Sequence, residues 1–587
     1  MHIYLPWKKF KEGDFPDVVI PLADGHVHRS SSPHSSTEQA EKTGLKEDGD
    51  TEKGVVAPPS VSSEPGAYSA YTLDALRQEI EFEVEQDGHD TVYDRKAKLV
   101  NKAMTDIGMG RYQWELFILC GFGWCADNVW LQGVALTLPQ LSLEFGVDSD
   151  WVRFTTCSLF TGLCVGAAFW GIAADIVGRR FAFNFTLFLC AAFSLASAGG
   201  PNWVGTCCLF ACLGLGVGGN LPVDGALFLE YLPMASNNLV TMLSAWWGVG
   251  NLIASVVAWG FIPKYTCAEG TKPCSQVPDG VPCCRKRDNM GWRYMVLTLG
   301  ALTAIMFLCR FLLFHLFESP KYLLSKNRQT EAVATVHAIA HKNGVKTWLT
   351  SDILDEIGGV DEAVEQNKGG STMEILKRNL RKFSTQQFAP LFSSKKLGLT
   401  TVLLWFCWAT IGMGYPLFNS FLPQYIQNAG NGEPQSTNTV YRNYTITAAC
   451  GVPGSILACF LVDVPKIGRR GAMALATAIT GVLLFCFTAS TDPDVQLVCS
   501  SLEAFFQNIM YGVLYAYTPE VFPAPYRGTA TGVCSCLNRM MGLFAPIVAI
   551  YGSDNASAPI YASGGLMLAA FLAMCALPIE TQGRQAM

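Results

Sequence analysis

Residues 171–180 read GIAADIVGRR and end an apolar stretch, and a related segment, residues 463–470 (DVPKIGRR), ends another. A second pair behaves in the same way, since residues 230–233 (EYLP) and 520–523 (EVFP) also end apolar stretches. The members of each pair lie six apolar stretches apart. We therefore expect an internal duplication of six plus six membrane spans, which is the parallel repeat found in transporters.

The composition favours a membrane protein. Half of the 587 residues are hydrophobic and only 15% are charged, whereas about 25% is usual for a soluble domain. The charged residues concentrate in residues 1–112 and 318–395. This distribution argues against a soluble enzyme and against a nucleic-acid-binding protein, and it predicts an all-α membrane protein with a soluble tail and a soluble insert.

Twelve stretches come close to the roughly 20 residues that a spanning helix needs. Each must be helical, because lipid offers no hydrogen-bond partner to a bare backbone amide. The expected spans lie near residues 114–138, 151–174, 181–199, 203–231, 236–262, 292–317, 396–425, 441–463, 471–490, 495–518, 528–552 and 556–577.

These spans set the expected organisation of the chain. The Ser- and Pro-rich residues 28–66 should be disordered, and short helices are expected near residues 73–84, 94–107 and 330–341. The expected parts are a cytoplasmic tail (1–112), a six-helix half (113–317), a cytoplasmic linker (318–395), a second six-helix half (396–578) and a cytoplasmic C-terminus (579–587).

Basic residues in the short loops predict the orientation. Arg179, Arg469 and Arg527 follow spans two, eight and ten, so the positive-inside bias assigns these loops and both termini to the cytoplasm. The opening residues contain no apolar core of a secretory peptide, so the first span is expected to act as the insertion signal. The loop at residues 263–291 is also basic, but it is longer, and we assign it to the opposite side.

Four of the 21 cysteines lie outside the spans, together in that long loop: Cys267, Cys274, Cys283 and Cys284. On a non-cytoplasmic surface, one or two disulfides are expected among them. A zinc site is the alternative, although the loop has no His and no CxxC pair. This loop, together with sequons at Asn443 and Asn555, favours the plasma membrane, with the vacuole or another internal membrane as the alternative.

Taken together, the motifs resemble the major facilitator superfamily of transporters. The GxxxDxxGRR pattern at residues 171–180 matches its signature loop, and other segments look like hallmarks of its sugar porters or of its synaptic-vesicle-protein-like branch and fungal relatives. The sugar-porter-like segments are residues 318–321 (ESPK), 519–528 (PEVFPAPYRG) and 578–583 (PIETQG), and the vesicle-protein-like segments are residues 123–128 (GWCADN) and 218–225 (GGNLPVDG). The resemblance covers residues 105–585 and implies twelve helices in two pseudo-symmetric halves.

The resemblance also implies a cytoplasmic gate, in which charged side chains at helix ends form salt bridges between the halves and stabilise the outward-open state. The alternative is that these charges only anchor helix ends and set the topology. The candidate gate residues are Gly171, Asp175, Gly178, Arg179, Arg180, Glu230, Glu318, Asp463, Arg469, Arg470, Glu520, Arg527 and Glu580.

Ionisable residues within spans are rare because their insertion is costly, and they indicate a second site. In the implied fold, spans one, four, seven and ten line the cavity, and Asp127, Asp224 and Glu503 lie on three of them. A carboxyl group in a low-dielectric cavity can load and release protons, so these three are the proton-coupling candidates. The alternative for Glu503 is a static pair with Arg539. The substrate-binding candidates are Asp127, Asn128, Gln132, Glu503, Asn508 and Arg539.

Two patterns are assigned to packing. Residues 214–219 (GLGVGG) resemble a dinucleotide-binding loop, but they lie within an apolar span and no strand precedes them, so close helix packing is expected. Aromatic residues such as Trp246, Trp247, Phe505 and Phe506 are expected to pack or to face lipid rather than to stack on a substrate.

The expected function is secondary transport of a small polar solute with a proton, by alternating access. An organic acid or another anion is favoured over a sugar, because Arg539 is intramembrane and residues 405–423 lack the paired glutamines of hexose porters. No ATP-binding loop, cofactor, metal or nucleic-acid partner is expected, and the protein should be a monomer in the bilayer. The alternative is a non-transporting nutrient sensor or vesicle-protein-like receptor with the same fold.

Overall fold

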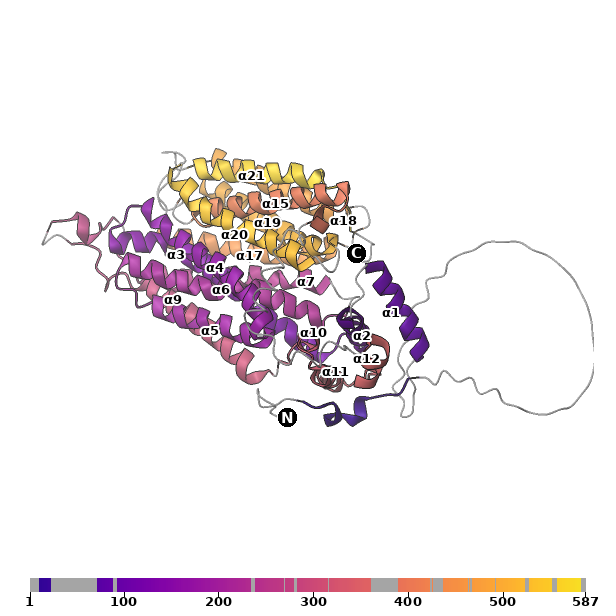
Figure 1. Ribbon diagram of the computed structural model, residues 1–587. Coiled ribbons are helices and arrows are strands. Elements are labelled where there is room, and N and C mark those ends of the chain that lie inside the picture. Colours follow the sequence, from indigo (N-terminus) through magenta and orange to yellow (C-terminus); the bar gives the residue numbers. More distant parts are fainter. Residues whose placement is uncertain are drawn as a thin grey trace, which may run out of the picture. The chain divides into compact units, whose positions relative to one another are not determined.

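The computed structural model describes residues 10–22, 71–87, 92–233, 238–268, 270–278, 282–314, 316–359, 389–422, 425, 436–462, 464, 467–490, 492–522, 527–551 and 557–581. The expected disordered segment 28–66 lies outside these residues. The regular elements of the described residues are helices (Figure 1). They fall into two compact units, a membrane unit (113–322 with 366–587 and residues 1–8) and a second unit (9–112 with 323–365).

The membrane unit contains the twelve expected segments, which confirms the all-α fold class. The first half comprises α3 (Arg111–Phe145), α4 (Phe154–Val177), α5 (Arg179–Ser197), α6 (Trp203–Tyr231), α7 (Asn238–Leu243) continued by α8 (Ala245–Phe261), and α9 (Gly291–Leu308). The second half comprises α15 (Lys395–Asn419), α17 (Thr437–Leu461), α18 (Gly468–Ala489), α19 (Pro493–Val521), α20 (Arg527–Tyr551) and α21 (Ala558–Cys575). The halves meet where α8 packs against α17 and α4 against α20.

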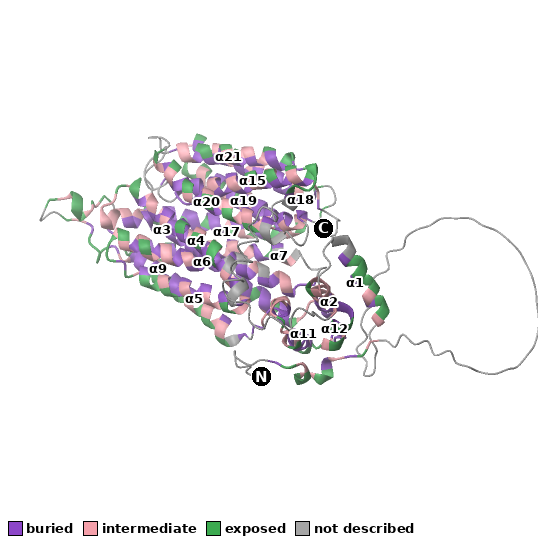
Figure 2. Cartoon of the chain, in the orientation of Figure 1, coloured by how far each residue is buried: buried purple, intermediate pink, exposed green. Residues whose placement is uncertain are grey.

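Among the described residues, eleven helices are long and apolar enough to cross a membrane. The remaining segment, α3, is a 35-residue helix whose middle carries Asp127, Asn128 and Gln132. These polar side chains are buried within the unit rather than turned outward. By contrast, apolar side chains such as Leu312 and Phe460 are two-thirds exposed, as expected for surfaces that face lipid. Figure 2 shows the buried residues along the helix faces that meet.

Close packing of α4 on α6 explains the glycine-rich segment of α6, as the sequence predicted. A Cβ atom added at Gly214 would lie 2.5 Å from the Leu159 carbonyl oxygen, and one at Gly218 would lie 2.4 Å from the Leu163 carbonyl oxygen. On the facing helix, a Cβ atom at Gly162 would lie 2.0 Å from the Ala211 carbonyl oxygen. Glycine on both sides therefore lets the two backbones touch.

The second unit combines the N-terminal tail with the linker between the halves. It contains α1 (Leu73–Asp87), α2 (Val92–Ile107) and α11 (Gln329–Asn343), close to where the sequence predicted short helices, and also α12 (Ser351–Gly358). Trp348 Nε1 donates to the Asp106 carboxylate at 2.8 Å, and the Ser351 amide donates to Glu12 at 2.8 Å. The sequence placed the tail and the linker in separate parts, because the contacting residues are more than 200 positions apart.

Candidate functional site

A carboxylate and a guanidinium from opposite halves meet near the middle of the membrane unit. Asp127 lies halfway along α3 and Arg539 halfway along α20, with Arg539 Nη2 3.7 Å from Asp127 Oδ1. This is an ion pair but is too long for a hydrogen bond, and neither atom has a hydrogen-bond partner among the described residues. The predicted alternative pair between Glu503 and Arg539 is therefore wrong, since Arg539 faces Asp127.

The pair opens into a cavity of about 60 Å³ between the halves. Its polar walls include two more candidates, because Asn128 and Asn508 line it together with Asp127 and Arg539. The two amides are held by the backbone, with Asn128 Nδ2 donating to the Trp247 carbonyl at 2.7 Å and Asn508 Nδ2 to the Gly451 carbonyl at 3.0 Å. Four of the six substrate-binding candidates thus lie on one cavity.

Aromatic rings form the other wall, which the sequence did not predict. The Trp247 ring lies 5.5 Å from that of Tyr511 and 5.1 Å from that of Tyr515, and all three line the cavity. The neighbouring Trp246 instead packs against Phe122, as the sequence predicted for this group of aromatics. Two adjacent tryptophans in an apolar span look alike in sequence, so no local pattern distinguishes Trp247 as the cavity residue.

The other two substrate-binding candidates lie outside the cavity lining. Gln132 donates its side-chain amide to the Tyr444 hydroxyl across the two halves. Glu503 is 1% exposed, and Asn419 of α15 faces it. Both residues are farther along their helices toward the disulfide loop than Asp127 and Arg539 are.

Asp224 forms a separate, fully buried ion pair. Arg310 Nη2 lies 2.6 Å from Asp224 Oδ2, and both side chains have no exposed surface. The Arg310 guanidinium also donates to the carbonyls of Leu119 and Phe183 and lies 3.8 Å above the Phe183 ring. Asp224 does not line the cavity described above. This proton-coupling candidate therefore has the contacts of a fixed structural pair rather than those of a cavity residue.

The repeated motifs form two equivalent clusters, and we call their side of the membrane unit the motif side. Arg179 lies 3.0 Å from Glu230, and Arg469 lies 2.6 Å from Glu520. Two further carboxylates accept hydrogen bonds from helix-start amides. Glu318 accepts from the amide of Arg179 at 3.1 Å, and Glu580 accepts from the amides of Arg469 at 3.1 Å and Arg470 at 3.2 Å.

These ion pairs each lie within one half, so they are not the bridges between the halves that the resemblance implied. Burial raises the pKa of Glu318, although backbone amides that donate to it oppose this shift. Gly178, with φ of +114°, ends α4 beside Glu318 and sets the turn into α5. The structure does not describe the surroundings of Gly171 or the side chains of Asp175 and Arg527, and Asp463 lies outside the described residues.

Hydrogen bonds between the halves gather on the opposite side, which we call the disulfide side because it carries the loop at residues 263–291. Arg153, at the start of α4, donates to the Ala549 carbonyl at 2.9 Å, and Tyr441 donates to the Leu136 carbonyl at 2.8 Å. The Gln132–Tyr444 contact lies between these and the cavity. The halves are therefore tied together on the disulfide side, and this accounts for motif-side ion pairs that stay within each half.

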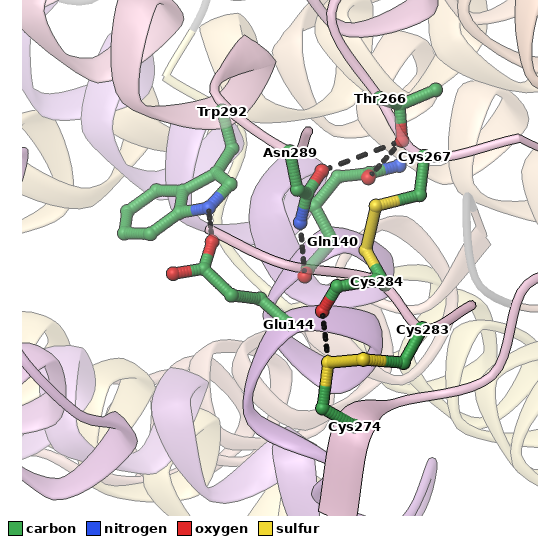
Figure 3. The surroundings of a disulfide bond; sticks show 9 residues. All are labelled: Gln140, Glu144, Thr266, Cys267, Cys274, Cys283, Cys284, Asn289 and Trp292. Carbon is green, nitrogen blue, oxygen red and sulfur yellow. Dashed lines mark hydrogen bonds between the residues drawn. A yellow bond between two sulfur atoms is a disulfide. The ribbon is translucent and has the colours of Figure 1, made fainter. Parts of the chain in front are cut away.

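The four loop cysteines are joined as Cys267–Cys284 and Cys274–Cys283 (Figure 3). The loop is anchored to the end of α3. Thr266 donates to Gln140 Oε1 at 2.6 Å, Asn289 donates to the Gln140 carbonyl at 2.9 Å, and Trp292 donates to Glu144 at 2.7 Å.

Among the described residues, no group of three or more His, Cys, Asp or Glu side chains could hold a metal ion. The sequon residue Asn443 is buried within α17, and Asn555 lies outside the described residues.

Known proteins resemble the chain over most of its length. Residues 95–587 match the family described as sugar (and other) transporter. The MFS siderochrome iron transporter 1 of Ceriporiopsis subvermispora is 41% identical over 87% of this chain and 96% of its own length. The synaptic vesicle 2-related protein of Xenopus laevis is 26% identical over 83% of this chain and 82% of its own length.

Solved structures of a xylose transporter share the fold. XylE from E. coli in a partially occluded inward-open conformation has a TM-score of 0.56 and 17% identity, covering 81% of this chain and 99% of the transporter. Another XylE structure, described as a proton:xylose symporter bound to 6-bromo-6-deoxy-D-glucose, has a TM-score of 0.57.

Proposed function

The chain belongs to the sugar (and other) transporter family of the major facilitator superfamily, and we propose that it carries a small organic anion together with a proton by alternating access. It is a multi-pass membrane transporter and not an enzyme. Substrate class and coupling are our proposal. The observation that carries them is the ion pair of Asp127 and Arg539, which joins the halves at the cavity.

The pair can couple a proton to an anion because each partner neutralises the other. With Asp127 charged, its carboxylate holds the Arg539 guanidinium. A proton on Asp127 removes that charge, and the guanidinium can then bind a substrate carboxylate by paired hydrogen bonds. The distance of 3.7 Å suits this exchange, since no direct hydrogen bond has to be broken. Loss of the proton restores the negative charge of Asp127. This carboxylate then competes with the substrate carboxylate for Arg539 and favours release of the substrate.

The remaining walls suit the body of such a solute. Trp247, Tyr511 and Tyr515 present aromatic surface, which favours an apolar body, while the amides of Asn128 and Asn508 supply polar contacts that fix its orientation. Once Asp127 is protonated, a neutral sugar would leave the Arg539 charge without an anion. Because XylE, which shares the fold, is described as a proton symporter, proton coupling is also supported by analogy.

The proposal extends to placement in the cell. We propose that the motif side and both termini face the cytoplasm, that the protein resides in the plasma membrane as a monomer, and that the motif-side clusters act as a gate when the halves rock. Basic residues in the motif-side loops and the disulfides on the other side support this orientation.

Uptake by purified protein in liposomes tests the function. A panel of radiolabelled carboxylates, neutral sugars and a ferric siderophore (the last because of the name of one relative) would be screened with and without a pH gradient. We expect a carboxylate to accumulate only with the gradient. Asp127→Asn should abolish gradient-driven accumulation but allow exchange of internal for external substrate, whereas Arg539→Gln should abolish both.

The matched control is Asp494→Asn, which removes an exposed carboxylate at the start of α19 and should leave uptake unchanged. Gradient-driven uptake that survives Asp127→Asn would reject the coupling role of this residue. Solute binding without accumulation of any panel member, with or without a gradient, would instead favour the receptor alternative.

A further inference from the structure

A polar row on α19 leads away from the central cavity toward the disulfide side. Glu503, Gln507, Tyr511 and Tyr515 are spaced four residues apart, so they share one face of the helix. Tyr511 and Tyr515 line the cavity. At about 1.5 Å per residue, Glu503 lies roughly 12 Å farther along the helix than Tyr511. The same face therefore carries a second ionisable position beyond the Asp127–Arg539 pair.

The Glu503 carboxyl is buried, with the Asn419 side chain facing it and no cation paired with it among the described residues. It is 1% exposed, and neither of its oxygens accepts a hydrogen bond from the described residues. The polar groups around it are engaged with each other, since Asn419 Nδ2 donates to Gln507 Oε1 at 3.1 Å and the Tyr444 hydroxyl donates to the Asn419 carbonyl at 2.9 Å. A buried carboxylate left in this state is costly, so it needs a cation, hydrogen-bond donors or a proton that neutralises it.

The surroundings suit a positively charged ligand. Tyr415 and Tyr444 lie within electrostatic range of the Glu503 carboxyl, and neither brings a positive charge. Arg539, halfway along α20, is already the partner of Asp127. The Gln507 side-chain nitrogen is also buried without a partner among the described residues, so the helices leave more polar groups here than they satisfy.

A small pocket lies about one helical turn from Glu503, toward the disulfide side. It has a volume of about 10 Å³, close to the space that one water molecule needs, and Tyr444, Thr447 and Ser500 contribute to its lining. Ser500 precedes Glu503 by three residues on α19 and accepts or donates a 3.1 Å hydrogen bond with Thr447. Polar side chains therefore lie on both sides of the helical turn that separates the pocket from the carboxyl.

We propose that Glu503 is the centre of a second ligand site, which binds a monovalent cationic group in addition to the anion and proton handled at Asp127 and Arg539. The group is either an alkali-metal ion or the ammonium group of a small solute. Its role in coupling rests on the proposed transport function, but its binding does not.

Thermal unfolding of the purified full-length protein in detergent tests the site without any transport assay. Salts would be compared at fixed pH and ionic strength, with N-methylglucamine chloride, whose cation is far larger than the others, replaced by NaCl, KCl or methylammonium chloride. Because a ligand that binds only the folded state stabilises it, we expect at least one replacement to raise the Tm of the wild type in a saturable manner. The sodium and potassium arms and the methylammonium arm distinguish the two sources of the cation.

The variants separate this site from the central pair. Glu503→Gln should lose the response, and Glu503→Asp should keep it with at least about a tenfold weaker apparent affinity, while Asp127→Asn should keep it in full. The proposal is overturned if no cation raises the wild-type Tm, if only a lower pH does so (a proton site), if the response survives Glu503→Gln, or if Asp127→Asn abolishes it. None of these results depends on whether the panel of solutes is transported.

Discussion

At the scale of single residues, two buried carboxylate–guanidinium pairs of the membrane unit differ in a way that separates structure from function. Asp224 and Arg310 are in direct contact at 2.6 Å with no exposed surface, and Arg310 has two further backbone acceptors. Asp127 and Arg539 are 3.7 Å apart beside a cavity, and the facing atoms lack other partners among the described residues. The first pair has the features of a fixed contact, and the second those of a contact that can exchange.

This difference predicts unequal costs of losing the arginine. Arg310→Met should destabilise the protein by about 3–5 kcal/mol, because it leaves Asp224 as an uncompensated buried charge. Arg539→Met should cost clearly less, because Asp127 borders a cavity that water can enter. Chemical or thermal unfolding in detergent, followed by size-exclusion chromatography, would measure both. Equal losses for the two variants would contradict the distinction.

The sequence identified most of these residues but not their partners. Asp127 and Arg539 stand out because charges within spans are rare, and this holds whichever way their helices are rotated. Which side chain meets Arg539 depends on how α20 docks against the other half. The spacing of residues along the sequence does not determine this docking. For the same reason, the sequence could not predict that Trp247 lines the cavity. Its position there depends on α8 meeting Tyr511 and Tyr515 of the second half.

At the scale of elements, the contact of α4 with α6 shows why helix positions were predictable. Span limits follow from apolar length, and α6 begins and ends at the predicted residues 203 and 231. Its glycines were correctly assigned to packing, since the backbone of α4 occupies the space that their side chains would need. The pairing of tail and linker in the second unit was missed, because short amphipathic helices do not specify a distant partner.

Gly218→Ala should therefore be strongly destabilising. The added Cβ atom would lie 2.4 Å from the Leu163 carbonyl oxygen, so α4 and α6 would have to separate, and overpacking of this kind costs about 1–3 kcal/mol. The matched control is Gly565→Ala in α21, where a Cβ atom meets nothing within 4 Å. That substitution should be neutral or stabilising by up to about 1 kcal/mol. Unfolding midpoints of the two variants give the comparison, and equal midpoints would count against backbone contact as the reason for glycine.

At the scale of the whole membrane unit, the halves are held together unevenly. Hydrogen bonds from Arg153, Tyr441 and Gln132 cross between the halves on the disulfide side, whereas the described motif-side ion pairs remain within one half. In an alternating-access cycle, the opposite arrangement must also be reached, with the disulfide side open. The crossing bonds then contribute directly to the equilibrium between the two arrangements.

Tyr444→Phe tests that contribution, because it removes both the acceptor for Gln132 and the donor to the Asn419 carbonyl. Each hydrogen bond is worth about 0.5–1.5 kcal/mol net, and only the contact with Gln132 crosses between the halves, so the equilibrium should shift by up to about tenfold toward opening of the disulfide side. Hydrogen–deuterium exchange should then rise at the disulfide-side ends of α3 and α17. Tyr517→Phe is the matched control, since its hydroxyl bonds to the Ile579 carbonyl within one half, and its exchange there should equal that of the wild type. Unchanged exchange in Tyr444→Phe would mean that packing of α8 on α17, rather than the hydrogen bond between Gln132 and Tyr444, keeps that side closed.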